Sequence, residues 1–156
     1  MILSASVIFY HPEAYSVVGK TLMGRHSAGE SFLAAYMKYA SQEVRAIFTD
    51  SEGAEVTFKD SVLPAFADKK ITFFNRSSFS SLHKFGCLFY PGPTLGPLAR
   101  HRSVIGDDSF SLCGITHTTS SLSAINSITE LLGEPVYPWD ALICTSNAVK
   151  KHVDFL

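Results

Sequence analysis

The chain has little charge and no excess of basic residues. Of its 156 residues, 13 are Lys or Arg and 14 are Asp or Glu, which gives a formal net charge of -1. A surface that binds nucleic acid needs a basic excess to neutralise phosphates. The balanced charge therefore argues against nucleic acid as a partner.

Long apolar runs are also missing, although 46% of the residues are hydrophobic. The longest runs, of about five to seven residues, are far shorter than the roughly 20 that a membrane-spanning helix needs. Residues 1–10 lack the basic start of a signal peptide. We therefore expect one soluble, cytoplasmic domain over residues 1–156, with peripheral membrane contact left open.

Cysteine is scarce, and its spacing excludes two kinds of site. Cys87, Cys113 and Cys144 are odd in number, far apart and without a CxxC pair, which argues against a disulfide framework and against a zinc centre. Each cysteine lies inside an apolar run. We expect reduced cysteines in the core, because free cysteine is among the most buried residue types.

Several catalytic and phosphate-binding motifs are absent from the sequence. Gly19, Gly24 and Gly29 follow the first expected strand, but they do not have the G-x-G-x-x-G spacing, and no Walker GK[ST] pair is present. The chain also has no Gly-x-Ser-x-Gly, and no Ser-His-Asp or Cys-His-Asn set can be assembled with any specificity.

What the sequence does contain is an alternation of short apolar runs with helical patterns. Strands are expected at 6–10, 43–49, 70–75, 86–90, from 110 onward, and at 141–144. Helical patterns occupy 27–40, 56–66 and 122–132, and a shorter helix is expected around Phe79 and Leu82. In the first of these, Ser27 and Glu30 have the spacing of a capping box. A last helix would begin after Ser146 or Asn147, either of which could cap it. This alternation predicts an α/β fold, a Rossmann-like three-layer sandwich with a mostly parallel sheet of about six strands.

The stretch from Phe110 to Gly133 is the most informative part of the chain. It reads as a buried strand, a Thr/Ser-rich tip that holds His117, and a helix with Leu122, Ile128 and Leu132 on its inner side. Ligand sites of open α/β sheets gather at such strand ends. His117 is therefore the first candidate for a functional group, the alternative being a histidine that only hydrogen-bonds its own loop.

The segment 91–109 is expected to be a long loop, because it is rich in Pro, Gly and charge. Arg100, His101 and Arg102 in this segment would attract a phosphate or a carboxylate, or else form a solvated surface cluster. Two further clusters are more ordinary. Asp107 and Asp108 read as solvent-facing acids rather than metal ligands, and Tyr137 and Trp139 as a packing corner rather than a sugar platform.

The start of the first helix offers a place for an anion. Free backbone N–H groups at a helix N-terminus attract negative charge, and Arg25 and His26 stand beside Ser27. The alternative is a flexible loop with ordinary turn glycines.

Three segments together resemble the N-terminal domain of GT-B glycosyltransferases of the retaining family-four kind. GRHSAGESFLAAYMKYA is similar to the family's Gly-Gly-x-Glu helix start, with Ala28 in place of the first glycine. GITHTTSS is similar to the strand that ends in a histidine beside the donor cleft, and WDALICTSNAVKKHV to the last strand, tip and helix of that domain.

The resemblance implies the acceptor-side half of an enzyme that moves a sugar from a nucleotide-sugar donor to a sugar, lipid or small-molecule acceptor. The second half, which would hold the nucleotide, is expected to lie beyond this chain, so the fragment alone should be inactive. No metal or other cofactor is implied. His117 would be the catalytic residue near the transferred sugar, and the candidate substrate-binding residues are Gly24, Arg25, Gly29, Thr116, Thr118, Arg100 and Arg102. A binding module of the same fold, without catalysis, is the competing hypothesis.

Overall fold

Six parallel strands form the single sheet of this computed structural model, which describes residues 6–16 and 24–156. The strands are β1 (Ser6–Phe9), β2 (Val44–Phe48), β3 (Lys70–Phe74), β4 (Cys87–Phe89), β5 (Ser111–Thr116) and β6 (Ala141–Cys144). Each neighbouring pair is parallel. The predicted α/β, Rossmann-like sheet is confirmed, and all six expected strands are present.

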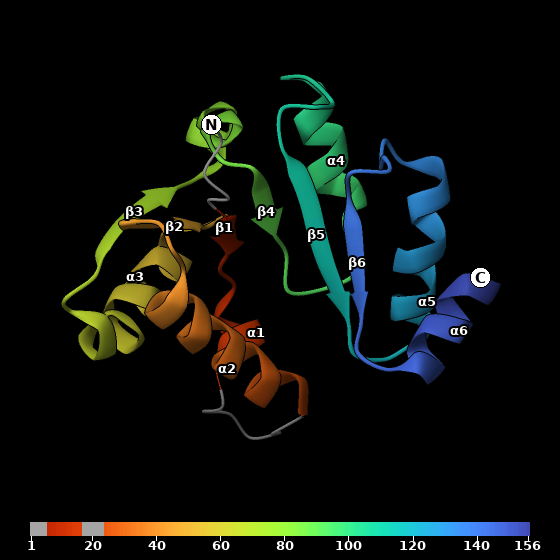
Figure 1. Cartoon of the computed structure of the whole chain (residues 1–156), viewed down its shortest axis with the longest axis horizontal. Helices are drawn as coiled ribbons and strands as arrows, with labels where there is room; N and C mark the ends of the chain where they lie inside the picture. The colour runs from red at the N-terminus through yellow and green to blue at the C-terminus, as the bar shows by residue number, and fades with distance from the viewer. Residues whose placement is uncertain (1–5, 17–23) are drawn as a thin grey trace.

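The strand order is β3-β2-β1-β4-β5-β6. The chain therefore moves outward in one direction from β1 to β3, crosses back, and moves outward in the other direction from β4 to β6 (Figure 1). The reversal between β1 and β4 is a topological switch point, where ligands of open α/β sheets bind beyond the carboxyl ends of the strands.

Helices connect the strands and cover the sheet. The α-helices are α1 (Pro12–Tyr15), α2 (Gly24–Tyr39), α3 (Glu52–Ser61), α4 (Gly96–Ser103), α5 (Leu122–Thr129) and α6 (Asn147–Phe155), and three 3₁₀ segments are η1 (Leu63–Phe66), η2 (Arg76–Lys84) and η3 (Glu130–Gly133). Ser146 caps α6 by accepting a hydrogen bond from the Val149 N–H at 3.2 Å, as its position predicts.

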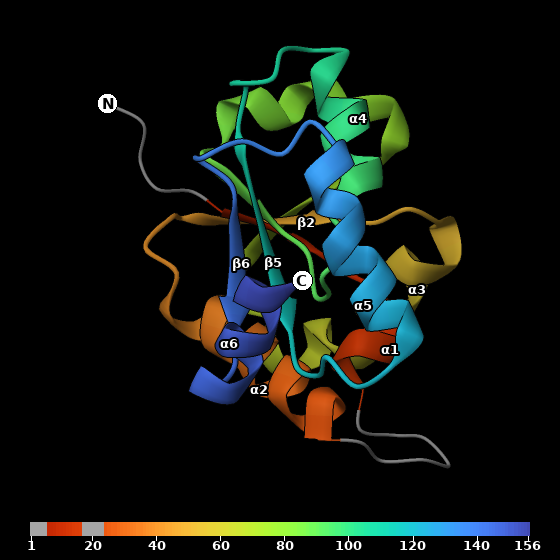
Figure 2. The same cartoon turned by 90° about the vertical axis from the view of Figure 1, so that its right-hand side faces the viewer.

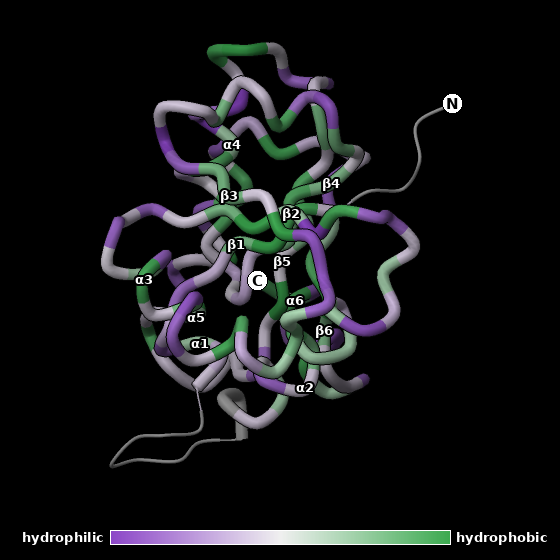
Figure 3. The backbone as a smooth tube through the Cα atoms, turned by 90° about the vertical axis from the view of Figure 1, so that its left-hand side faces the viewer, coloured by the Kyte–Doolittle hydropathy of each residue, from purple (hydrophilic) through white to green (hydrophobic). Residues whose placement is uncertain are grey.

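Two apolar cores lie on the two faces of the sheet, because successive side chains of a strand point to opposite faces. In β1, Val7 and Phe9 join the core under η2 and α4, whereas Ile8 joins the core under α2 and α3. Figure 3 shows the hydrophobic strands in the middle of the molecule between the helical layers. The sheet is thus the central layer of three.

The prediction of a loop over 91–109 is wrong, because this segment contains α4. Pro97 stands in the first turn of α4, where the missing N–H costs no helical hydrogen bond. Leu95 and Ala99 then anchor the helix in the core. The proline and glycine that suggested a loop are the start signal of a helix instead.

The helix after β1 begins earlier than its sequence pattern suggests. It starts at Gly24, so Ser27 lies inside the helix and the predicted capping box at Ser27 and Glu30 is wrong. The short helix α1 was also not foreseen. It begins at Pro12, shortly after β1 ends at Phe9, again with proline in a first turn.

Some predicted core residues are more exposed than expected. Leu122 and Leu132 are 73% and 84% exposed, while Ile128 on the same helical segment is buried. The three cysteines are half-buried, and Cys113 packs against the core under α2 and α3.

Candidate functional site

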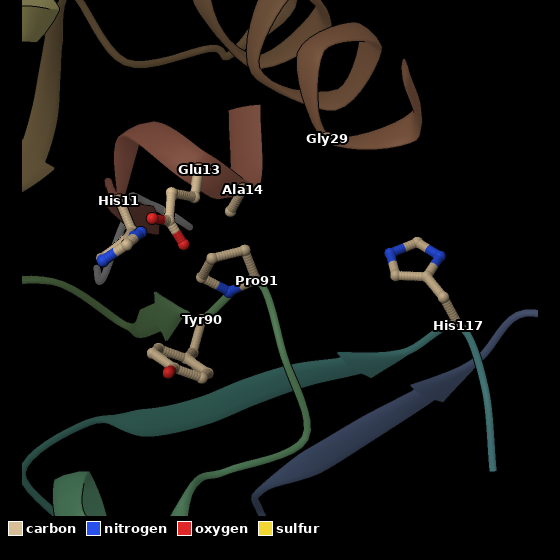
Figure 4. A pocket seen from close by; sticks show the side chains of 7 residues that line it. All are labelled: His11, Glu13, Ala14, Gly29, Tyr90, Pro91 and His117. Atoms are coloured by element: carbon tan, nitrogen blue, oxygen red, sulfur yellow. The ribbon is translucent and has the colours of Figure 1, made fainter. Parts of the chain in front are cut away.

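A cavity of about 200 Å³ lies at the switch point of the sheet. Its lining residues are His11, Glu13, Ala14, Gly29, Tyr90, Pro91 and His117 (Figure 4). They come from α1 and the residue before it, from α2, and from the segments at the ends of β4 and β5. The carboxyl ends of three strands thus bring together residues that are far apart in the sequence.

Local structure holds the strand exits in place. The Tyr10 N–H donates to the Phe48 carbonyl at 2.8 Å, which continues the pairing of β1 with β2. The Tyr90 N–H donates to the Cys113 carbonyl at 2.8 Å and continues the pairing of β4 with β5. Pro91 has no N–H to donate, so the chain leaves the sheet there.

The polar side chains of the cavity stand on two walls. Figure 4 shows the His117 imidazole on one side, the His11 ring and the Glu13 carboxylate together on the other, and Pro91 between them. His117 is half-buried, whereas His11 and Glu13 are exposed. The arrangement can hydrogen-bond a ligand from two sides, with a carboxylate as acceptor and imidazoles as donors or acceptors.

Tyr90 contributes an aromatic wall to the cavity. Its ring packs edge-on against Phe9, with ring centroids 5.0 Å apart. Burial raises the pKa of the Tyr90 phenol, and the nearby Asp50 carboxylate adds to this shift. Tyr90 therefore remains neutral across the physiological range.

Gly29 lines the cavity, and its lack of a side chain has a packing role. A Cβ at this position would lie 2.0 Å from the carbonyl oxygen of Ala14. Because that oxygen belongs to the backbone of α1, only glycine lets α2 approach α1 so closely. The resemblance assigned Gly29 to the donor phosphates, and the structure adds a second reason for a glycine here.

The other candidates beside Gly29 are Gly24 and Arg25. Gly24 is the first residue of α2. The side chain of Arg25 lies outside the part of the chain that the structure describes.

Thr116 and Thr118 shape the loop that carries His117. The Thr116 hydroxyl is buried and donates to the Thr118 carbonyl at 2.8 Å. The Thr118 hydroxyl oxygen accepts from the Ser120 N–H at 3.1 Å. Neither threonine lines the cavity, and the hydrogen bonds of both hold the loop that carries His117.

Arg100 and Arg102 lie away from His117, on α4. Arg100 forms an ion pair with Glu134 on the surface. The Arg102 side chain is 0% exposed and donates to Asp140 and to the Phe110 carbonyl, next to the amino ends of β5 and β6. Arg102 therefore has no exposed surface to offer a substrate, and it is not part of a solvated cluster either. It is a buried structural arginine.

Five of the lining residues were not found from the sequence as site residues: His11, Glu13, Ala14, Tyr90 and Pro91. The signal was present, because these residues lie at or just after the ends of the first and fourth expected strands. They were interpreted only as part of a strand or as residues that end one, since the strand order that makes β1 and β4 neighbours is not visible in the sequence.

The described residues contain no group of three or more His, Cys, Asp or Glu side chains placed to hold a metal ion. In the same part of the chain, no helix has the length and apolar character to cross a membrane. Comparison with protein-family models, with curated proteins and with solved structures found no match for this chain.

Proposed function

We propose that this chain is the acceptor-side domain of a glycosyltransferase that transfers a sugar from a nucleotide-sugar. The observation that carries the proposal is the switch-point cavity, in which a carboxylate and two imidazoles face one another across a space of about 200 Å³. The resemblance of three segments to GT-B N-terminal domains supports the same assignment.

The charge of the cavity favours a neutral ligand with many hydroxyl groups. Glu13 contributes a negative charge, and the only other ionisable side chains among the described lining residues are two histidines and one tyrosine. A carboxylate repels a diphosphate but accepts hydrogen bonds from sugar hydroxyls. The cavity therefore holds the sugar end of the reaction, and the nucleotide diphosphate is bound mainly by a second α/β domain.

The size of the cavity also favours one wall of a larger binding cleft. Pockets for complete small-molecule ligands usually measure about 300–1,000 Å³, more than the roughly 200 Å³ here. One wall of a cleft that closes against a second domain would have this size. In that cleft His117 orients a hydroxyl of the sugar, and Glu13 and His11 hold the opposite side.

The test measures binding of sugars to the chain itself. Ligand-observed NMR with a panel of free hexoses, nucleotide-sugars and inorganic diphosphate is expected to detect at least one sugar or nucleotide-sugar. His117→Ala should weaken that binding by about twofold to twelvefold, since one hydrogen bond contributes roughly 0.5–1.5 kcal/mol.

His83→Ala is the matched control, because His83 is exposed on η2 and contacts only its local backbone, the Ser80 carbonyl at 2.6 Å. It should leave the affinity unchanged. Binding of diphosphate without any sugar, or equal affinities of the His117→Ala variant and the parent chain, would contradict the proposal. A protein that binds none of the panel would favour the competing binding module.

A further inference from the structure

A second cavity, of about 390 Å³, opens over the face of the sheet that α2 covers only in part. Figure 1 shows β4, β5 and β6 beside α2 with no described helix drawn in front of them, and Figure 2 shows α5 on one side of β5 and β6. Two cysteines line this cavity, Cys87 on β4 and Cys113 on β5, among the apolar side chains of Ile8, Phe32, Phe89 and Ile143.

The strand register places the two cysteines on the same face. Cys87 is opposite Ser111, and Phe89 is opposite Cys113, on neighbouring parallel strands. Because alternate residues of a strand share a face, Cys87 and Cys113 are diagonal neighbours on one surface. The Cys113 thiol donates to the Gly114 carbonyl at 3.9 Å, and it lies close enough to Cys87 for the two thiols to change each other's pKa. Both thiols are half-buried, so the cavity gives a small molecule access to them.

The two sulfurs differ in chemical character. The neighbouring Cys113 thiol, together with the nearby Ser111 hydroxyl, lowers the pKa of Cys87, while proximity to Cys87 and burial raise the pKa of Cys113. Once one thiol of such a pair has lost its proton, the second proton is held more tightly. A more acidic attacking thiol beside a protonated partner is the arrangement of dithiols that exchange with disulfides.

We propose that Cys87 and Cys113 form a redox-active dithiol that exchanges with low-molecular-weight disulfides. The Cys87 thiolate attacks one sulfur of oxidised glutathione, which breaks the glutathione S–S bond, releases one glutathione thiolate and leaves a mixed disulfide on Cys87. Cys113 then loses its proton to water and attacks the Cys87 sulfur, which displaces the second glutathione as a thiolate. The protein dithiol is oxidised to a disulfide by two electrons, and one glutathione disulfide is reduced to two glutathiones.

The diagonal position of the two cysteines makes this disulfide reducible. Cys87 and Cys113 are two positions out of register on neighbouring parallel strands, whereas a disulfide requires a Cα separation of about 4.4–6.8 Å. Bridging residues that are out of register requires a local adjustment of the strands. A bond formed in this way is readily reduced again, which suits a reversible site rather than a structural bridge.

Cys144 is an internal control in the same chain. On β6, Ala141 is paired with Cys113 of β5, and Cys144 is paired with Thr116 of β5. Because Cys144 is three residues after Ala141, its side chain points to the opposite face of the sheet from Cys113. It lines a different cavity with Leu142 and Lys150. Cys144 therefore has no thiol partner within the dithiol site.

The experiment treats the reduced chain with oxidised glutathione at pH 7.5 and follows the intact mass and the non-reduced peptide map. The expected product is about 2 Da lighter than the starting protein and yields a peptide pair joined through Cys87 and Cys113, which dithiothreitol reverses. A product that carries glutathione on Cys144 only, or an unchanged mass, overturns the proposal. This measurement needs no variant.

Two variants then separate the roles of the sulfurs. Cys113→Ser should trap a single glutathione on Cys87, whereas Cys87→Ser should react at least about tenfold more slowly at Cys113, because burial still raises the pKa of Cys113 when Cys87 is absent. Cys144→Ser should form the internal disulfide at the rate of the parent chain. Equal rates of modification at Cys87 and Cys113 in the two single variants would overturn the assignment of attacking and resolving cysteine.

Discussion

Replacing Arg102 with Met should remove a large part of the stability of the fold. The guanidinium donates to both carboxylate oxygens of Asp140, at 2.5 and 2.8 Å, and to the carbonyls of Phe110 and Pro135, at 3.0 and 2.9 Å. Both charged side chains are 0% exposed. Without Arg102, a buried carboxylate would keep only the N–H groups of Leu112 and Tyr137 as partners.

The expected loss is about 3–5 kcal/mol of unfolding free energy, the usual cost of leaving one charge of a buried pair without its partner. Urea denaturation followed by circular dichroism measures this quantity. Thermal melting should fall by roughly 6–20 °C, since about 1 kcal/mol corresponds to roughly 2–4 °C for a domain of this size.

Arg100→Met is the matched control, because Arg100 lies on the same helix and pairs with Glu134 at the surface. Exposed ion pairs contribute about 0–1 kcal/mol. The double variant Arg102→Met and Asp140→Leu should recover part of the loss, since it removes the unpaired charge. If Arg102→Met lowers the unfolding free energy no more than Arg100→Met does, then Arg102 does not stabilise the amino ends of β5 and β6 as we infer.

Two further predictions concern α2. Gly29→Ala should destabilise the chain by about 1–3 kcal/mol, because the new methyl group would meet the Ala14 backbone oxygen. Gly53→Ala in α3 is the control and should stabilise the chain by roughly 0.5–1 kcal/mol, because nothing lies within 4 Å of the added Cβ. Urea denaturation of both variants measures the two changes in unfolding free energy, and equal changes would contradict the prediction. Burial raises the pKa of Tyr36 to about 12, and its hydroxyl donates to the Ser6 carbonyl at 2.8 Å. The native state thus holds this proton more tightly than the unfolded state, so its contribution is present below about pH 10 and lost as pH rises toward 12. The stability difference between the parent chain and Tyr36→Phe should therefore shrink over that pH window, and a constant difference would contradict the reasoning.

The strands were predictable because their signals are local. KITFFN and ALIC are short apolar runs bounded by polar residues or turn formers, and the structure has β3 and β6 there. The helix α4 was missed for an equally local reason. Gly96 and Pro97 are common in loops as well as in the first turn of a helix, and only the burial of Leu95 and Ala99 against the sheet decides between the two.

The sequence by itself determined the class of the fold, because the alternation of apolar runs with helical patterns leaves few ways to bury both kinds of element. It also singled out His117, since a polar residue directly after a buried strand lies at the edge of the sheet. Tertiary structure decided which strand ends are neighbours. The strand order places β1 beside β4, and so brings His11 and Glu13 opposite His117, and it buries Arg102 against Asp140. Such contacts depend on strand order and register, which the packing of the whole sheet decides and no short stretch of sequence encodes.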